Sequence, residues 1–529
     1  MSLLEIAGFN LRIGAAPVLH DVSFRVERGE IVGIIGESGS GKSMTALSVI
    51  QLLPQGAAGD GRISLAGKDV TTLSERALCR LRGSEVGMVF QEPMTALNPL
   101  QTIGQQVAET ILIHENTTRR QALARAADAL DRVEMPQSRF PLSRYPHELS
   151  GGQRQRVGIA MAIALRPSLL IADEPTTALD VTTQAEVLRL LKRLVQEDGM
   201  GLVLISHDLG VVSGMADRIV IMRHGRVVEE GTFATLGHPY SRALLEASDH
   251  VPPRAGARGE GTLLEVRGVV REYGTPRRGW LGKPGVFRAV DGVSFEIRRG
   301  ENLGLVGESG CGKSTLTRAI LGLEDVQAGK VLLDGQPVYD GQRANRAVRR
   351  RMQVVFQDPY GSFNPRWTVA RLVSEPFHLL DDPPRGAERQ RAVSDALESV
   401  GLSREDGQKY IHEFSGGQRQ RIAIARALII RPELIILDEA VSALDVSIRA
   451  QILDLLADLG RRFGLTYLFI SHDLSVVRNV TDRVLVMRGG RIVEEGATET
   501  VFTAPSHPYT RRLIDALPRL PRMAAGGGA

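Results

Sequence analysis

Two short glycine-rich stretches that end in lysine and serine have the composition of a loop that binds phosphate. Residues 36–43 read GESGSGKS, and residues 307–314 read GESGCGKS. Glycines let backbone amides converge on a phosphate without side-chain clashes, the lysine reaches the β- and γ-phosphates, and the serine hydroxyl ligates Mg²⁺. The predicted phosphate-binding residues are Gly36, Gly39, Gly41, Lys42, Ser43, Gly307, Gly310, Gly312, Lys313, Ser314 and Thr315.

Two adjacent acids follow an apolar run in each half of the chain. The segments SLLIADE and ELIILDE place Asp173 beside Glu174 and Asp438 beside Glu439. Neighbouring side chains at the end of a strand point in different directions. The first acid is therefore predicted to hold Mg²⁺ and the second to polarise an attacking water. Two solvated acids are the alternative, but the phosphate loops in both halves favour the functional interpretation.

The sequence serine-glycine-glycine-glutamine precedes an apolar helical pattern in each half. The serine suits a helix N-cap and the glycines expose backbone amides, which predicts a second anion site for a γ-phosphate. A plain helix start is the alternative. The residues concerned are Ser150, Gly151, Gly152, Gln153, Ser415, Gly416, Gly417 and Gln418.

A parallel sheet with helices is needed to present these groups together. Residues 31–35, IVGII, have the β-branched composition of a buried parallel strand, and a helical pattern follows the phosphate loop. His207 and His472 each end another apolar run, 33 residues after the second acid in both halves, which predicts a hydrogen bond to phosphate. Each half is predicted to be an α/β core with an antiparallel β portion and a helical arm around residues 105–133.

The chain is a duplication of one domain. Equivalent residues lie 265 apart from Ser150/Ser415 to His207/His472, a period far too long for a solenoid. We predict one domain at 1–248, a Pro/Gly-rich linker at 249–262, a second domain at 263–519 and a disordered tail at 520–529. The second half carries about eleven extra residues near 275–290, predicted to be a surface loop.

Composition excludes several classes of protein. Of 529 residues, 43% are hydrophobic and 24% charged, which is ordinary for a globular chain. No apolar run approaches 18 residues, so no membrane span is predicted, and the N-terminus lacks the pattern of a secretory signal. A formal charge of +4 predicts no nucleic-acid partner. The two cysteines, Cys79 and Cys311, are too few for a disulfide framework.

Together these residues resemble the nucleotide-binding domains of ABC transporters, over nearly the whole chain and twice. The resemblance implies two tandem P-loop NTPase domains of the ABC ATPase type that bind ATP and Mg²⁺. By this resemblance, the glycine-rich loops are Walker A loops. Each acid pair consists of a Walker B acid followed by a catalytic glutamate, and the serine-glycine-glycine-glutamine segments are signature loops. It also assigns the Q-loop glutamines, D-loop aspartates and switch histidines: Gln91, Gln357, Asp180, Asp445, His207 and His472. The Q-loop glutamines are expected to touch Mg²⁺ or the attacking water.

The geometry of this family implies a head-to-tail sandwich of the two halves with two composite ATP sites. Site one would combine Lys42, Ser43, Gln91, Asp173, Glu174 and His207 with Ser415 and Gly417. Site two would combine Lys313, Ser314, Gln357, Asp438, Glu439 and His472 with Ser150 and Gly152. Both sets are complete, so two hydrolytic sites are expected.

Further motifs resemble one branch, the ATPases of dipeptide and oligopeptide importers, including Yej-type systems for peptide and microcin uptake. They are NPL and NPR after the Q-loops, YPHELSGGQRQR, and HPYSRALL at 238–245 with HPYTRRLI at 507–514. The resemblance implies two transmembrane permease subunits as partners and, through them, an extracytoplasmic solute-binding protein. It also implies a peripheral location on the cytoplasmic face of the bacterial inner membrane.

The chain departs from this branch in several places. Many members bind an iron–sulfur cluster through a group of cysteines, and no such cluster is expected here. Tyr273 matches an adenine-stacking aromatic residue, whereas its counterpart is Ile13. Ala440 replaces the proline found at position 175. Cys311 lies inside a phosphate loop, where it is either a small space-filling residue, the favoured interpretation, or a thiolate.

Two other classes of function remain as alternatives. A tandem ABC ATPase can act on ribosomes or DNA, but the short Pro/Gly-rich linker and the absence of zinc-binding cysteines favour the importer. A regulatory binder that never hydrolyses ATP is opposed by the two intact glutamates. For an importer, short peptides are the expected solute, with glutathione, peptide antibiotics, nickel or sugars as alternatives.

Overall fold

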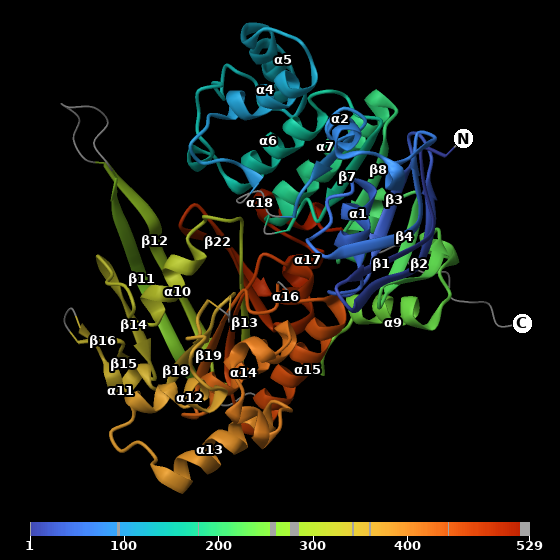
Figure 1. The fold of residues 1–529 in the computed structure, drawn as a ribbon. Helices are drawn as coiled ribbons and strands as arrows, with labels where there is room; N and C mark the ends of the chain where they lie inside the picture. The colour runs from blue at the N-terminus through green and yellow to red at the C-terminus, as the bar shows by residue number, and fades with distance from the viewer. Residues whose placement is uncertain are drawn as a thin grey trace, which may run out of the picture. The chain divides into compact units, whose positions relative to one another are not determined.

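The computed structural model describes residues 2–91, 96–177, 179–253, 261–275, 285–340, 343–358, 361–442 and 444–518. The chain divides into two compact units: unit 1 comprises Met1–Ser248 together with the C-terminal residues from Pro518, and unit 2 comprises Asp249–Leu517. Each unit has two hydrophobic cores of its own, one on either side of its main sheet. Figure 1 shows the helices and strands that form the two units. No helix among the described residues is both long enough and apolar enough to cross a membrane.

The main sheet of unit 1 has six strands in the order β10-β9-β3-β8-β7-β6. Five of these strands are parallel, and β10 pairs antiparallel at the edge. The central strands β3, β7 and β8 consist of buried, mostly apolar residues, as is typical of a parallel sheet. The strands are β3 (Ile31–Ile35), β6 (Val86–Val89), β7 (Leu169–Asp173), β8 (Gly201–Ile205), β9 (Arg218–Arg223) and β10 (Arg226–Gly231).

A second, antiparallel sheet of unit 1 has the order β2-β1-β4-β5. Its strands are β1 (Leu4–Ile13), β2 (Ala16–Val26), β4 (Ala57–Leu65) and β5 (Lys68–Asp69). The α-helices are α1 (Lys42–Val49), α2 (Glu75–Leu81), α4 (Ile103–His114), α5 (Arg119–Arg132), α6 (Gly151–Ile163), α7 (Val181–Asp198), α8 (Leu209–Met215) and α9 (Pro239–Ser248), and short 3₁₀ turns cover Val70–Thr72, Pro146–Glu148 and Phe233–Thr235. The predicted helical arm is confirmed as the helix pair α4 and α5, each begun by a threonine capping box.

Unit 2 repeats this plan. Its main sheet has the order β18-β19-β20-β13-β21-β22, its antiparallel sheet the order β12-β11-β14-β15, and β16 pairs with β17. The strands are β11 (Thr262–Thr275), β12 (Gly285–Arg298), β13 (Asn302–Val306), β14 (Ala328–Leu333), β15 (Gln336–Pro337), β16 (Tyr339–Asp340), β17 (Arg343–Ala344), β18 (Met352–Val355), β19 (Leu434–Asp438), β20 (Thr466–Ile470), β21 (Arg483–Arg488) and β22 (Arg491–Ala497).

The helices of unit 2 also follow those of unit 1. The α-helices are α10 (Lys313–Ile320), α11 (Arg346–Arg349), α12 (Val369–Val373), α13 (Gly386–Ser399), α14 (Gly416–Leu428), α15 (Val446–Phe463), α16 (Leu474–Val480), α17 (Thr498–Thr503) and α18 (Pro508–Asp515). Short 3₁₀ turns cover Glu375–Leu379, Arg404–Gln408 and Ile411–Glu413.

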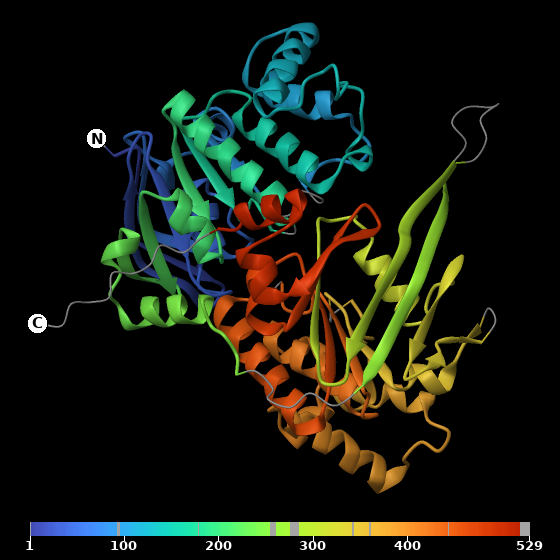
Figure 2. The ribbon, with the colours of Figure 1, turned by 180° about the vertical axis from the view of Figure 1, so that it is seen from behind.

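The prediction of a surface loop at residues 275–290 is wrong at both ends of that range. Residues 285–290 continue β12 and pair with 271–275 of β11, where Gly285 lies opposite Thr275 and Phe287 opposite Tyr273. Figure 2 shows the resulting long two-stranded ribbon. The physical reason is that β-formers such as Val286 and Phe287 favour strand pairing, which extends the ladder between β11 and β12. The intervening residues 276–284 lie outside the described part.

The start of the predicted linker is held in place. His250 lies 2.7 Å from the carboxylate of Asp454 on α15, and the side-chain amide of Asn479 on α16 donates to the His250 carbonyl oxygen at 3.0 Å. The linker residues 254–260 and the predicted tail at 520–529 lie outside the described residues.

Candidate functional site

The loop after β3 in unit 1 closes around the side chain of Lys42. The Lys42 Nζ donates to the carbonyl oxygens of Gly36 at 2.7 Å and Glu37 at 2.9 Å. Gly41 caps α1 with a φ of 100°, a conformation that favours glycine. A Cβ on Gly36 would lie 2.3 Å from the Met222 carbonyl oxygen, so only glycine fits there. The loop thus places a lysine and a helix N-terminus where a phosphate could bind.

Unit 2 builds the same loop after β13. The Lys313 Nζ donates to the carbonyl oxygens of Gly307 at 2.6 Å and Glu308 at 3.0 Å. Gly312 caps α10 with a φ of 112°, and a Cβ there would lie 2.2 Å from the Ala289 carbonyl oxygen. Ser314 and the neighbouring Thr315 follow on α10, with Ser314 exposed.

Cys311 is buried within the second loop. Burial raises the pKa of its thiol, an effect larger than the opposing influence of the Lys313 charge. A raised pKa and burial favour the small space-filling side chain over the thiolate.

The first acid of each pair lies at the end of a strand of the main sheet, where Asp173 is buried and Asp438 is partly buried. Burial raises the pKa of Asp173, aided by the charge of Glu174 and opposed by a hydrogen bond with Ser43. The Asp173 Oδ1 is buried without a hydrogen-bond partner among the described residues. Burial and the charge of Glu439 raise the pKa of Asp438 to about 6. A buried orphan oxygen beside a serine hydroxyl fits a hard cation such as Mg²⁺.

The second acid of unit 1 is held by three neighbours. The Glu174 Oε2 accepts hydrogen bonds from the Gln91 Nε2 at 2.9 Å and the Thr177 Oγ1 at 2.9 Å, and lies 3.3 Å from the His207 Nδ1. The structure therefore brings the predicted glutamine, glutamate and histidine together. Glu174 itself has a φ of 47°, which is rare for a residue with a side chain.

The second acid of unit 2 has fewer partners. The Glu439 Oε2 lies 3.3 Å from the His472 Nδ1, and Glu439 has a φ of 53°. Gln357 follows β18 and is exposed, and no hydrogen bond joins it to Glu439 among the described residues. Ser442, the counterpart of Thr177, donates instead to the Glu439 carbonyl oxygen at 2.8 Å.

Both glutamates remain ionised despite burial. Burial alone raises the pKa of Glu174, but hydrogen bonds from His207 and Thr177 and the nearby charges outweigh it, so the pKa is lowered. The pKa of Glu439 is lowered in the same way, against burial, by His472. Burial would lower the pKa of His472, but its bond to Glu439 outweighs this and raises it. An ionised carboxylate is what a general base requires.

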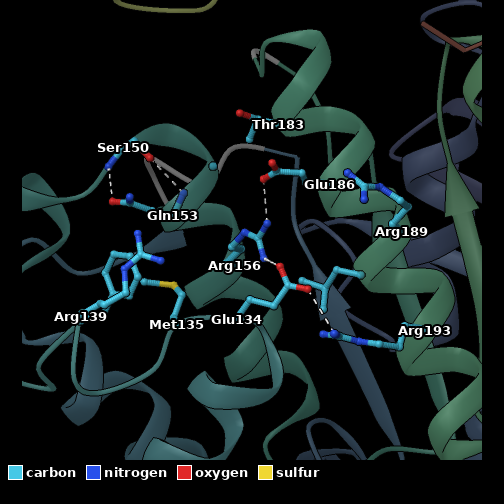
Figure 3. Close-up of a pocket in the computed structure, with 13 residues that line it drawn as sticks. Glu134, Met135, Arg139, Ser150, Gln153, Arg156, Thr183, Glu186, Arg189 and Arg193 are labelled. Carbon is cyan, nitrogen blue, oxygen red and sulfur yellow. Dashed lines mark hydrogen bonds and ion pairs between the residues drawn. The ribbon is translucent and has the colours of Figure 1, made fainter. Parts of the chain in front are cut away.

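The signature segment of unit 1 borders a cavity of about 640 Å³. Figure 3 shows Arg156 between Glu134 and Glu186, which it contacts at 2.6 and 3.0 Å. The cavity is lined by Ser150, Gly152 and Gln153 with residues of α7, and by no described residue of the phosphate loop at 36–43. The signature segment and the phosphate loop of unit 1 therefore do not share this cavity.

The predicted helix N-caps are confirmed. Ser150 begins α6, its amide donates to the Gln153 Oε1 at 3.0 Å and its Oγ accepts from the Gln153 amide at 3.3 Å. Ser415 begins α14, with the matching bond from its amide to the Gln418 Oε1 at 3.0 Å. The neighbouring glycines Gly151 and Gly416 have no Cβ contact closer than 3.6 Å.

The D-loop aspartates and the predicted stacking tyrosine lie elsewhere in each unit. Asp180 caps α7, where its carboxylate accepts from the Thr183 amide at 3.0 Å, and Asp445 begins α15. Tyr273 lies on β11, with its hydroxyl bonded to Glu324 and the Arg271 guanidinium 4.7 Å from its ring centre.

Sequence reasoning missed Thr177 and the tyrosines of the HPY segments. Nothing in the residue type of Thr177 marks it as a partner of Glu174, because a threonine hydroxyl can bond to many groups. The HPY segments carried a signal, since they recur in both halves, but their contacts depend on the fold. Tyr509 accepts a hydrogen bond from the Glu308 amide at 3.0 Å.

Comparison with known proteins identifies the family of this chain. The ABC transporter family matches residues 19–177 and 290–442, and the oligopeptide/dipeptide transporter C-terminal region matches 493–526. A glutathione import ATP-binding protein of Salmonella paratyphi A is 45% identical over 98% of this chain and 89% of its own length. Its counterpart in Escherichia coli O157:H7 is 47% identical over 94% and 86%. The solved structure of cbiO1 from Clostridium perfringens, part of an ABC transporter complex, is 29% identical over 46% of this chain and 92% of its own, with a TM-score of 0.40.

The duplicated phosphate loops and these matches define an ATP-binding cassette protein, and the chain belongs to the ABC transporter family. Its relatives and its C-terminal region place it in the oligopeptide/dipeptide importer branch, as a tandem ABC ATPase whose hydrolysis of ATP is coupled to transport. The alternative of a protein that acts on ribosomes is not supported.

Proposed function

We propose that the chain energises the import of short peptides or peptide-like compounds across the bacterial inner membrane. The observation that carries this proposal is the duplicated grouping of lysine, acid pair and histidine, in a chain whose relatives are named glutathione import ATP-binding proteins. Glutathione is itself a short peptide, so it is the first solute to test, with other peptides, nickel and sugars as alternatives.

The proposal assigns two composite ATP sites to the two domains, with boundaries at 1–248 and 263–519. In site one, Lys42 binds phosphate and Glu174 accepts the proton of the attacking water while His207 orients the carboxylate. Lys313, Glu439 and His472 do the same in site two. The signature serines Ser150 and Ser415 complete the site of the other domain, and Asp180, Asp445 and Tyr273 are assigned secondary contacts. When bound, Mg²⁺ would supply positive charge that stabilises the phosphate being transferred. The residues that would hold the ion are Ser43, Gln91, Asp173, Ser314, Gln357 and Asp438.

Two membrane permeases are the proposed partners, and an extracytoplasmic binding protein delivers the solute to them. The arm of unit 1 exposes apolar side chains that suit such a contact, because Leu100 is 85% and Ile113 70% exposed near the two ends of α4. The chain then works as a peripheral subunit at the cytoplasmic face of the membrane. ATP favours the closed state because closure adds contacts to both γ-phosphates.

Co-purification with the permeases tests this proposal. We expect the chain to be captured with co-expressed permeases, and Leu100→Asp with Ile113→Asp to reduce capture about tenfold by placing charge in an apolar contact. Phe463→Asp, at an exposed apolar residue of unit 2, is the matched control and keeps capture. Capture with ribosomes and not with permeases contradicts the proposal.

A further inference from the structure

The HPY segments at 238–240 and 507–509 are built alike in the two units. In each, the histidine Nδ1 accepts a hydrogen bond from the tyrosine amide, at 3.2 Å for His238 and 3.1 Å for His507. This bond fixes the start of α9 in unit 1 and of α18 in unit 2.

Each segment is tied to the edge strand of the main sheet by a glutamate. Glu229 on β10 accepts from the His238 amide at 3.0 Å, and Glu494 on β22 accepts from the His507 amide at 3.1 Å. A carboxylate that accepts backbone amides holds a turn more firmly than a neutral acceptor does. The tyrosine that follows is therefore carried by a fixed turn and not by a loose tail.

The tyrosine rings are buried against the sheet. Tyr509 is 1% and Tyr240 8% exposed. The guanidinium carbon of Arg488, at the end of β21, lies 4.9 Å from the Tyr509 ring centre, and that of Arg223 on β9 lies 4.6 Å from the Tyr240 ring centre. A phenol buried this deeply needs a hydrogen-bond partner to offset its desolvation.

In unit 2 that partner is the phosphate loop. The Glu308 amide donates to the Tyr509 hydroxyl oxygen at 3.0 Å. The Glu308 carbonyl oxygen accepts from the Lys313 Nζ at 3.0 Å, so Glu308 is held on both sides. Lys313 must turn toward a phosphate when ATP binds, and the bond to Tyr509 is then the one that continues to hold the start of the loop.

We propose that Tyr509 is a positioning residue for the second phosphate loop, which keeps the Glu308 peptide in place while Lys313 moves to the phosphates. This inference rests on the proposed function, since it takes the loop at 307–314 to bind ATP. It gives the C-terminal HPY segment a direct role in ATP binding through the hydroxyl of one residue.

Unit 1 provides a natural comparison. The Tyr240 hydroxyl lies beside Glu37, and burial together with the charge of Glu37 raises the pKa of Tyr240 to about 12. No hydrogen bond of ordinary geometry to the Tyr240 hydroxyl is found among the described residues. Each tyrosine therefore meets the glutamate of its own phosphate loop, and the bond of ordinary geometry is the one between Tyr509 and Glu308.

The test removes each hydroxyl while keeping each ring. In a Lys42→Ala background, which leaves the phosphate-binding lysine only in unit 2, Tyr509→Phe is expected to weaken binding of a non-hydrolysable ATP analogue with Mg²⁺ about three- to tenfold, the effect of losing one hydrogen bond. Hydrogen exchange of residues 307–312 should become faster. In a Lys313→Ala background, Tyr240→Phe should leave affinity and the exchange of residues 36–41 within about twofold.

The outcomes separate this inference from the proposed function. Unchanged affinity and exchange in Tyr509→Phe, while Lys42→Ala combined with Lys313→Ala abolishes binding, overturns the inference alone. Binding that survives loss of both lysines overturns the proposed function. Equal losses in Tyr509→Phe and Tyr240→Phe also overturn the inference, because only Tyr509 has a hydrogen bond of ordinary geometry to its loop. If Tyr509→Phe does not fold, the unaltered chain decides, because rapid exchange of the Glu308 amide would show that no bond to Tyr509 holds it.

Discussion

Glu174 and Glu439, which carry the proposed catalytic carboxylates, have backbone conformations that residues with side chains rarely adopt. Their φ angles are 47° and 53°, and each residue directly follows a buried strand. The Glu174 amide donates to the Ile205 carbonyl oxygen at 2.9 Å, and the Glu439 amide donates to the Ile470 carbonyl oxygen at 2.8 Å. Such conformations cost on the order of 1–3 kcal/mol and persist where neighbouring structure enforces them. Here the strained turn directs each carboxylate at its histidine.

The hydrogen bond from Thr177 to Glu174 gives a prediction for one residue. Thr177→Val keeps the shape of the side chain but removes the donor at 2.9 Å, so the carboxylate is less well oriented. We expect kcat for ATP to fall about three- to tenfold with little change in KM, as expected when a proton-transfer group is displaced. Steady-state ATPase assays of the assembled transporter measure both constants.

Ser442 is the matched control for Thr177. Its hydroxyl donates to the backbone of Glu439 and not to the carboxylate, so Ser442→Ala should change kcat less than twofold. Equal losses of kcat in the two variants, or none in Thr177→Val, would contradict the role given to Thr177.

At the scale of elements, the signature glycines also allow two helices to pack closely. A Cβ on Gly152 would lie 2.2 Å from the Thr183 Cγ2 on α7, and a Cβ on Gly417 would lie 2.5 Å from the Ile448 Cγ2 on α15. Gly152 and Gly417 are therefore needed for the fold of each unit, whatever contact they make with ATP. Gly151 has no such constraint, since its nearest neighbour would be Leu179 at 3.6 Å.

This packing predicts different effects of alanine at adjacent positions. Gly152→Ala should lower the free energy of unfolding by about 1–3 kcal/mol, because α6 and α7 must move apart. Gly151→Ala should change it by less than about 0.5 kcal/mol. Denaturant unfolding of the full chain measures both values, and a Gly152→Ala protein as stable as Gly151→Ala would contradict the packing argument.

Elements were predictable from the sequence where the local pattern decides them. The strand at 31–35, the phosphate loops and the caps at Ser150 and Ser415 follow from β-branched runs, glycine spacing and a capping serine. The loop prediction for 275–290 is wrong because the glycine- and proline-rich composition of this stretch gives no sign that its two ends pair. The bonds of Glu174 to Gln91 and of Tyr509 to Glu308 join residues 83 and 201 positions apart, which no local pattern predicts.

For the whole molecule, duplication explains the length of the chain. The main sheet and the antiparallel sheet have the same strand order in both units. Each unit also has a phosphate loop whose carbonyl oxygens bind its lysine, and a glutamate–histidine pair. The units differ in detail, since Glu174 is bound by Gln91 and Thr177 while Glu439 has neither partner among the described residues. We propose that both units nevertheless supply the base of a working ATP site.

Glutamine substitution of each glutamate tests that claim most directly. Glu174→Gln and Glu439→Gln keep the size of the side chain and remove the base, so each single variant of the assembled transporter should lose ATP turnover about tenfold or more. Binding of ATP should be retained in both, which shows that the sites are still formed. If only one of the two variants loses turnover, a single hydrolytic site serves the transporter and the claim is contradicted.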